Sequence, residues 1–238
     1  MKRFLLGLIV LIGSMAGVAA AASSGTVKVT LSPDQPSANS ALTVSAQGPF
    51  KQPAGKGQVT SLRLEVQKGF TSSAKSVKVL CSSSQADNGT CPSESKVGSG
   101  TAVVTGTVNG VTGQDTITFQ AYLAVPEKAG DISSIVLHGT DSVFHKSGQT
   151  RGRLVTTASG GLELIFTSIT GSSAPKGAKV TLDRLSLHVR AVRKAKSGHT
   201  YSLITNPPKC SGSWRGALIV TYKSGTPTTR SLTAACSG

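Results

Sequence analysis

The chain has 238 residues and a formal net charge of +15, with 25 Lys and Arg residues against 10 Asp and Glu residues. Only 4% of the residues are aromatic, which argues against a surface of exposed rings on which bases or sugars would stack. Val, Leu, Ile and Ala must therefore supply most of the core, and the length suffices for one large domain or two small ones.

The N-terminus predicts a secretory signal peptide over residues 1–22. Lys2 and Arg3 precede an apolar run of roughly 15 residues, and a short series of Ala residues follows it. The run is shorter than the ~20 residues that span a bilayer. We therefore expect residues 23–238 to form the mature protein, secreted or otherwise extracytoplasmic in the cell envelope, without a transmembrane segment.

Along the mature chain, apolar and polar residues alternate with a period of two, and turn residues interrupt them about every ten residues. In chain order, the clearest alternating segments are 26–31, 61–67, 115–125, 161–166, 179–190 and 216–225. This pattern predicts an all-β protein with roughly twelve to fourteen strands, folded as a two-sheet sandwich of the jelly-roll or immunoglobulin-like type. We expect one domain over 23–238, with two halves, 23–128 and 129–238, as the alternative.

The segment 179–190 changes phase within one extended stretch. Its apolar residues share one parity up to Leu182 and the other parity from Leu185 onward. A slip of one residue at Asp183–Arg184 predicts a β-bulge, and the alternative is two strands that meet at a sharp corner.

Four cysteines in an exported chain predict two disulfide bonds, because thiols oxidise outside the cytoplasm. Proximity in the sequence favours Cys81–Cys91 and Cys210–Cys236, each expected to stabilise the fold by roughly 3 kcal/mol. The spacings differ from the close Cys pairs of zinc sites. We therefore expect no bound metal, no cofactor and no catalytic cysteine.

The two cysteine-containing stretches also resemble known patterns. Residues 81–102 are similar to a Cys…Cys-Pro-x-x-Ser-x-x-Gly pattern, and residues 203–225 to an Asn-Pro-x-x-Cys-x-Gly-x-Trp pattern that leads into a strand. Both resemble secreted β-rich proteins of actinobacteria. The resemblance implies an exported, sandwich-like protein without an assigned reaction. Trp214 follows Cys210 closely, and we expect it to pack on that disulfide rather than to form a sugar platform.

Candidate catalytic groups are sparse. No G-x-S-x-G nucleophile motif occurs, and the only clustered histidines are His138 and His145, with Asp141 between them. On a tight loop these residues could bind a metal or form an acid–base set, but loop His and Asp residues more often do neither. A glycoside hydrolase needs two neighbouring carboxylates. The sequence offers two arbitrary pairs, Asp131 with Asp141 and Glu163 with Asp183. We expect no catalytic residue.

The charge is concentrated in the second part of the chain. Residues 23–142 hold 9 basic and 8 acidic residues, whereas residues 143–238 hold 14 basic and 2 acidic ones. Such asymmetry indicates a region that meets a polyanion. The candidate anion-binding residues are Arg184, Arg190, Arg193, Lys194 and Lys196. The alternative for the run 190–198 is a solvated hairpin tip.

These features predict an exported, non-enzymatic binding or structural protein of the cell envelope. Its expected partner is an anionic cell-wall polymer, a lipid headgroup or a polysaccharide, with nucleic acid less favoured. The alternative is a carbohydrate-active enzyme whose acidic residues lie on a concave sheet.

Overall fold

The computed structural model describes residues 26–50, 59–108, 111–142, 147–167, 179–222 and 226–238. The predicted signal peptide lies outside these residues. Three short helices occur in the described part, η1 (Ala74–Ser76), α2 (Ser83–Asp87) and η2 (Ser93–Ser95). The strands are β1 (Thr26–Ser32), β2 (Ala41–Phe50), β3 (Val59–Val66), β4 (Lys96–Val108), β5 (Val111–Ala124), β6 (Ser133–Asp141), β7 (Ser147–Thr156), β8 (Leu162–Phe166), β9 (Lys179–Val189), β10 (Arg193–Lys196), β11 (His199–Ser202), β12 (Ser213–Tyr222) and β13 (Thr228–Ala235). The all-β prediction is confirmed.

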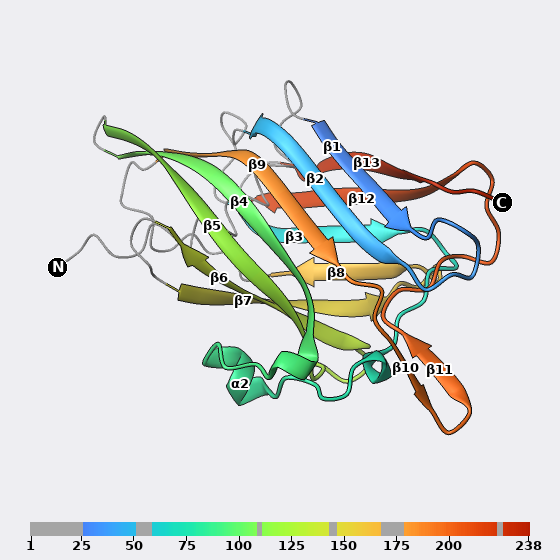
Figure 1. The fold of residues 1–238 in the computed structure, drawn as a ribbon. Coiled ribbons are helices and arrows are strands. Elements are labelled where there is room, and N and C mark those ends of the chain that lie inside the picture. Colours follow the sequence, from blue (N-terminus) through green and yellow to red (C-terminus); the bar gives the residue numbers. More distant parts are fainter. Residues whose placement is uncertain (1–25, 51–58, 109–110, 143–146, 168–178, 223–225) are drawn as a thin grey trace.

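Eleven of these strands form one antiparallel sheet in the order β1-β2-β9-β4-β5-β6-β7-β8-β3-β12-β13. Figure 1 shows two layers, with β1, β2, β9, β4 and β5 crossing in front of the remaining strands. The expected jelly-roll or immunoglobulin-like pair of separate sheets is not confirmed, because the long strand β5 pairs with β6 and carries the hydrogen-bonding ladder from one layer into the other. Strands from before and after residue 129 also alternate in this sheet, since β9 lies between β2 and β4.

The sheet is nearly closed. Cα atoms of its two edge strands, β1 and β13, lie within 8 Å of one another. Since every neighbouring pair is antiparallel and the number of strands is odd, β1 and β13 run parallel to each other. Among the described residues β1 is paired only with β2, and β13 only with β12, so a seam without ladder hydrogen bonds separates them.

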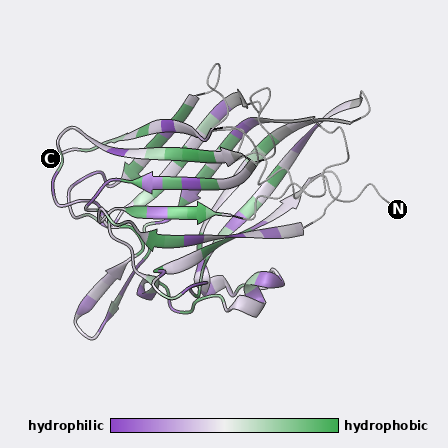
Figure 2. Cartoon of the chain, turned by 180° about the vertical axis from the view of Figure 1, so that it is seen from behind, coloured by the Kyte–Doolittle hydropathy of each residue, from purple (hydrophilic) through white to green (hydrophobic). Residues whose placement is uncertain are grey.

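The main core lies between the two layers. Along the strands of this sheet hydrophobic and polar residues alternate, and Figure 2 shows the alternation as hydrophobic and hydrophilic bands. Leu62, Ile117, Phe119, Leu185 and Val220 are buried together in this core. The alternating segments 61–67 and 115–125 therefore lie in strands that each contribute buried residues to this core.

The predicted β-bulge in segment 179–190 is confirmed, and the segment forms the single strand β9. In the register with β4, Val103 faces Arg184 and Val104 faces Leu182, which leaves Asp183 as the extra residue. The Asp183 carboxylate accepts a hydrogen bond of 2.6 Å from the Thr105 hydroxyl. The bulge accounts for the change of parity along the strand, and Leu185, which follows it, is buried in the core.

Both predicted disulfides are present, with Cα–Cα distances of 5.0 Å for Cys81–Cys91 and 5.9 Å for Cys210–Cys236. Two such bonds indicate an oxidising, extracytoplasmic environment. Trp214 is 2% exposed and lies in a small apolar cluster with Phe70 against the Cys210–Cys236 bond. Its predicted packing on that disulfide is therefore confirmed.

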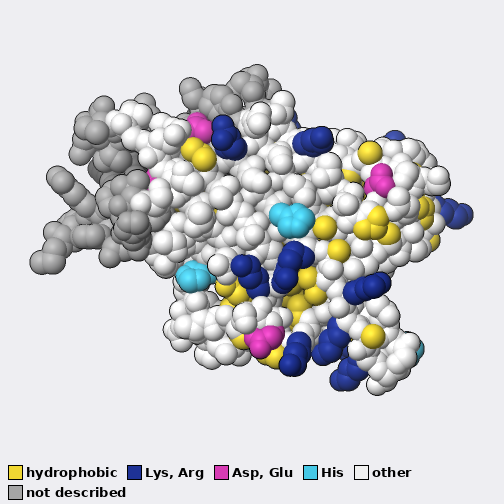
Figure 3. Space-filling model, in the orientation of Figure 1, with side chains coloured by type: hydrophobic (Ala, Val, Ile, Leu, Met, Phe, Trp, Pro, Cys, Tyr) yellow, Lys and Arg dark blue, Asp and Glu magenta, His cyan; other side chains and the backbone are white. Residues whose placement is uncertain are grey.

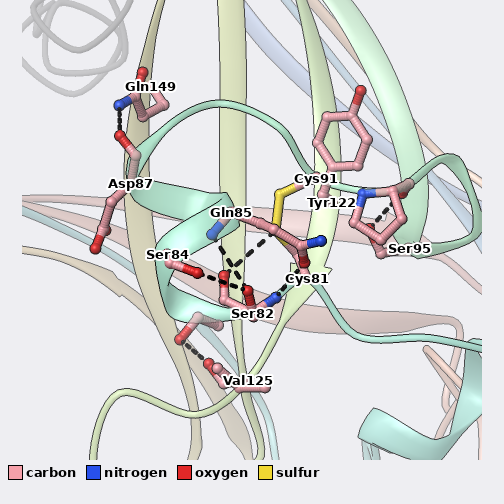
Figure 4. Close-up of a disulfide and its surroundings, with 12 residues drawn as sticks. Cys81, Ser82, Ser84, Gln85, Asp87, Cys91, Ser95, Tyr122, Val125 and Gln149 are labelled. Carbon is pink, nitrogen blue, oxygen red and sulfur yellow. Dashed lines mark hydrogen bonds between the residues drawn. A yellow bond between two sulfur atoms is a disulfide. The ribbon is translucent and has the colours of Figure 1, made fainter.

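The Cys81–Cys91 loop contains the helix α2, which the sequence analysis did not predict. Its signal is a capping box: the Ser82 hydroxyl accepts from the Gln85 N–H, and the Gln85 side chain accepts from the Ser82 N–H. Figure 4 shows this loop lying over the end of β5, where Cys81 exchanges backbone hydrogen bonds with Leu123 and Val125. Ala86 of the loop is also buried with Tyr122 and Val136, so the loop packs against the outer face of the sheet.

A glycine allows β4 and β9 to approach at the centre of the front layer. A Cβ atom on Gly100 would overlap the Ser186 carbonyl oxygen and the Phe119 ring, so the backbone would have to shift. We expect Gly100→Ala to lower the free energy of unfolding by about 1–3 kcal/mol in urea denaturation. Gly113→Ala is the control, because no atom lies within 4 Å of the added methyl group. Equal effects of the two substitutions would contradict this account.

Candidate polyanion-binding surface

The basic run begins where β9 ends. The Arg190 N–H donates to the Val97 carbonyl at 2.8 Å, and the Arg190 guanidinium donates to the Lys96 carbonyl. These two bonds hold Arg190 against the start of β4. Lys96 and Arg190, which lie far apart in the sequence, are therefore neighbours on the surface.

Beyond Arg190 the chain forms the hairpin β10–β11, which carries Arg193, Lys194 and Lys196. Ser197 and Gly198 connect its strands, and both have positive φ angles, of 52° and 77°. Two such residues are typical of a type I′ turn. The hairpin projects from the body of the sheet (Figure 1), as the hairpin alternative for this run anticipated.

A further cation, Lys75, adjoins this hairpin from the first half of the chain, and Lys78 follows it closely in the sequence. The Lys75 ammonium lies 5.1 Å from the centre of the Tyr201 ring, a cation–π contact between η1 and β11. Lys78 follows η1 and lies near Glu94. The pKa of the Glu94 carboxyl is lowered mainly by its own backbone N–H, then by the Ser93 hydroxyl and by the charge of Lys78.

We use the name basic surface for these seven cations: Lys75, Lys78, Lys96, Arg190, Arg193, Lys194 and Lys196. Figure 3 shows Lys and Arg side chains gathering on the lower part of this face, beside the hairpin. In the part of the chain that the structure describes, the ion pairs belong to Arg63, Arg151 and Arg153, and none includes a cation of the basic surface. No carboxylate among the described residues therefore lies within ion-pair distance of these cations.

The structure differs from the prediction in the position of Arg184 and in the segments that supply the cations. Arg184 points outward on β9 six residues before Arg190, about 20 Å away along the strand, so it does not join the other four predicted residues. The surface also does not belong to residues 143–238 alone, since Lys75, Lys78 and Lys96 come from the nearly neutral part of the chain. The sequence could not show this, because only the folded sheet brings η1 and β4 to the end of β9.

A polar groove of about 560 Å³ adjoins the basic surface on the outer face of β9, β4, β5 and β6. Its lining includes Lys96, Ser99, Gln120, Tyr122, His138 and His188. Outward-facing residues at matching register positions form a row across these strands, from His188 through Ser99 and Gln120 to His138. The groove therefore offers hydroxyl, amide and imidazole groups beside the cations.

Tyr122 closes one side of this groove. Burial raises the pKa of its phenol, so the hydroxyl remains protonated, and it donates a hydrogen bond to the Gln120 side-chain oxygen. At the other side, the Thr43 hydroxyl lies 3.1 Å from the His188 Nδ1 atom. Both contacts fix polar side chains that would otherwise rotate freely.

The predicted histidine cluster does not form a tight loop. His138 lies within β6 and lines the groove, Asp141 is the last residue of that strand, and His145 lies outside the described residues. Among the residues that the structure describes, no group of three or more His, Cys, Asp or Glu side chains is placed to hold a metal ion.

Neither of the two suggested carboxylate pairs comes together. Asp131 precedes β6 and Asp141 ends it, so this strand separates them, and four strands separate β8, with Glu163, from β9, with Asp183. Glu163 instead faces Glu65 across β8 and β3. Arg63 bonds to both of these carboxylates, at 2.9 Å for Glu65, so they act as partners of one guanidinium.

No family model, curated protein or solved structure matches this chain. Among the described residues, no helix has the length and apolar character needed to cross a bilayer.

Proposed function

We propose that the protein is an exported, non-enzymatic binding protein of the cell envelope that holds an acidic polysaccharide on the basic surface and in the adjoining groove. The observation that carries the proposal is the convergence of cations from three separate segments beside a polar groove. Opposite charges attract the polymer, and the groove positions its sugar units.

The chemistry of the groove favours a polysaccharide over other polyanions. Hydroxyl groups of a sugar both donate and accept hydrogen bonds, and Ser99, Gln120 and His138 offer matching donors and acceptors. Arg190 and Lys96 at the rim would pair with sulfate or carboxylate groups of the same chain. Nucleic acids are held chiefly by phosphate contacts and by stacking on exposed rings. The Tyr201 ring on the hairpin instead carries the Lys75 ammonium, 5.1 Å from its centre.

The test uses dextran sulfate as the acidic polysaccharide and uncharged dextran as the reference. A variant with Arg190, Arg193, Lys194 and Lys196 all replaced by Ser should bind dextran sulfate at least about tenfold more weakly at physiological salt. Its plot of log affinity against log salt concentration should also be shallower by roughly 2–3, because each lost contact removes released counterions. Titration calorimetry at several salt concentrations measures both quantities.

The matched control removes the same charge elsewhere. Lys28, Lys68, Lys128 and Lys209 are exposed and lie outside the basic surface, so replacing all four by Ser should change the affinity and the salt slope much less. If both variants weaken binding alike, the attraction is a general effect of net charge and the proposal fails. Stronger binding to anionic lipid vesicles or to duplex DNA than to dextran sulfate would replace the polysaccharide by that partner.

A further inference from the structure

The two layers of the sheet enclose an apolar cavity of about 240 Å³. Strands of both layers contribute to its walls, with Val29, Val44, Leu64, Leu164 and Leu187 among the lining residues. All five side chains point inward, and yet they remain half-buried rather than buried. Their exposed surface therefore faces an unfilled interior.

The cavity follows from the number of strands and the size of the side chains. A closed sheet of about eight strands is just wide enough for side chains to fill, and the width grows with each added strand. This nearly closed sheet has eleven strands, and short aliphatic residues dominate its inner face. The ladder hydrogen bonds fix the spacing between neighbouring strands and so the width of the nearly closed sheet. The two layers therefore cannot collapse onto such short side chains.

Water binds poorly in an apolar cavity of this kind, because few hydrogen-bonding partners line it. The lining atoms consequently lack van der Waals partners on one side, and an apolar molecule would restore these contacts. A cavity of about 150 Å³ accommodates benzene, with six carbon atoms. By that proportion, this cavity has room for about ten carbon atoms.

One polar group of the cavity has no partner. Ser72 lines the cavity, and its hydroxyl oxygen is buried and forms no hydrogen bond with any described residue. It lies two residues after Phe70, whose ring also lines the cavity and meets the Trp214 ring edge to face, with 5.6 Å between the ring centres. A buried hydroxyl without a partner is destabilising. A hydrogen-bonding group on a ligand would satisfy it.

The seam between β1 and β13 borders the same cavity. Val29 and Leu31 of β1 and Leu232 of β13 line it, and no ladder hydrogen bond links the two strands among the described residues. One end of the seam is fastened by the Ser237 hydroxyl, which donates to the Asp34 carboxylate at 2.8 Å. Separation of these edges would open the interior without breaking the sheet.

We propose that this cavity binds a single-chain amphiphile, with an alkyl chain of about ten carbon atoms inside and its polar head hydrogen-bonded to Ser72. The seam between β1 and β13 is the route of entry. This site is separate from the basic surface, because it lies inside the sheet rather than on its outer face. An uncharged ligand can therefore test it without interference from the net charge.

The experiment is a calorimetric titration of the full mature chain with 1-decanol, and with benzene as a probe that lacks a hydrogen-bonding group. We expect saturable binding of both at one site, with a negative heat-capacity change.

Val44→Phe places a ring in the cavity and should weaken decanol binding at least tenfold. Ser45→Phe adds the same ring to the outer face of the same strand and should leave binding unchanged. Ser72→Ala should weaken decanol binding about fivefold and leave benzene binding unchanged.

Absence of saturable binding by the unmodified chain would overturn the proposal on its own. Equal weakening by Val44→Phe and Ser45→Phe would place the probe on the outer surface and would also overturn it. If Val44→Phe does not fold, Leu64→Ala enlarges the cavity instead and should shift the preference from decanol toward 1-dodecanol. An unchanged preference in that variant counts against the site.

Discussion

Replacing Trp214 by Ala is expected to lower the free energy of unfolding by about 3–5 kcal/mol, the largest effect of any substitution considered for this protein. The indole is 2% exposed and contacts the Phe70 ring, and its N–H donates to the Lys209 carbonyl at 3.2 Å. Truncation would leave a void next to an interior that is already incompletely filled. Urea denaturation followed by far-ultraviolet circular dichroism measures the loss, because this signal does not depend on the indole.

Trp214→Phe separates packing from the lost hydrogen bond, since a ring remains while the N–H is removed. We expect it to cost about half as much as the alanine substitution. Tyr201→Ala, at a half-buried ring outside the core, should cost roughly 1 kcal/mol or less. A loss below 1 kcal/mol for Trp214→Ala would show that the cluster around Cys210–Cys236 does not depend on this side chain.

Local patterns of the sequence predicted the features of the fold that depend on local chemistry. Segment 61–67 alternates as a strand with one buried face does, and its Leu62 is buried in the core. The change of parity around Asp183 predicted the bulge. The continuity of the sheet was not predictable in this way. It depends on the pairing of β5 with β6 and of β2 with β9, and strand alternation is the same whether the ladder continues or stops at a layer boundary.

The same distinction applies to the candidate site. The cations of the run 190–198 lie close together in the sequence, and four of the five predicted residues lie on the hairpin β10–β11 or directly before it. Lys75 and Lys96 were missed because each is an isolated cation in a neutral segment. Arg184 lies only six residues before Arg190 in the sequence, but the extended conformation of β9 places the two residues far apart.

The second large effect is expected for Asp131, whose side chain is 1% exposed. Its carboxylate receives two hydrogen bonds from the Arg153 guanidinium, of 2.8 and 2.5 Å, and one of 3.0 Å from the Lys128 N–H. Asp131→Asn would leave Arg153 without its anionic partner. Removing one member of a buried ion pair costs about 3–5 kcal/mol, and the partial exposure of Arg153 should reduce this to about 2–4 kcal/mol at neutral pH.

The pH dependence of this loss provides the sharper test. The hydrogen bonds from Arg153, and to a lesser degree the Lys128 N–H, hold the pKa of the Asp131 carboxyl below its ordinary value of 3.8. A group whose pKa is lower in the folded state contributes stability above its unfolded pKa, and this contribution is lost as the pH falls through the folded value. The difference in unfolding free energy between the unmodified chain and Asp131→Asn should therefore be constant between about pH 5 and 7 and shrink below about pH 4.

Glu127→Gln is the matched control, because Glu127 pairs with Arg151 at 3.1 Å but its side chain is 31% exposed. Exposed ion pairs contribute about 0–1 kcal/mol, so this substitution should have a small effect at every pH. Urea denaturation at pH 7, 5, 4 and 3 compares the three proteins. A difference for Asp131→Asn that stays the same down to pH 3 would mean that the amide disturbs packing rather than the ion pair.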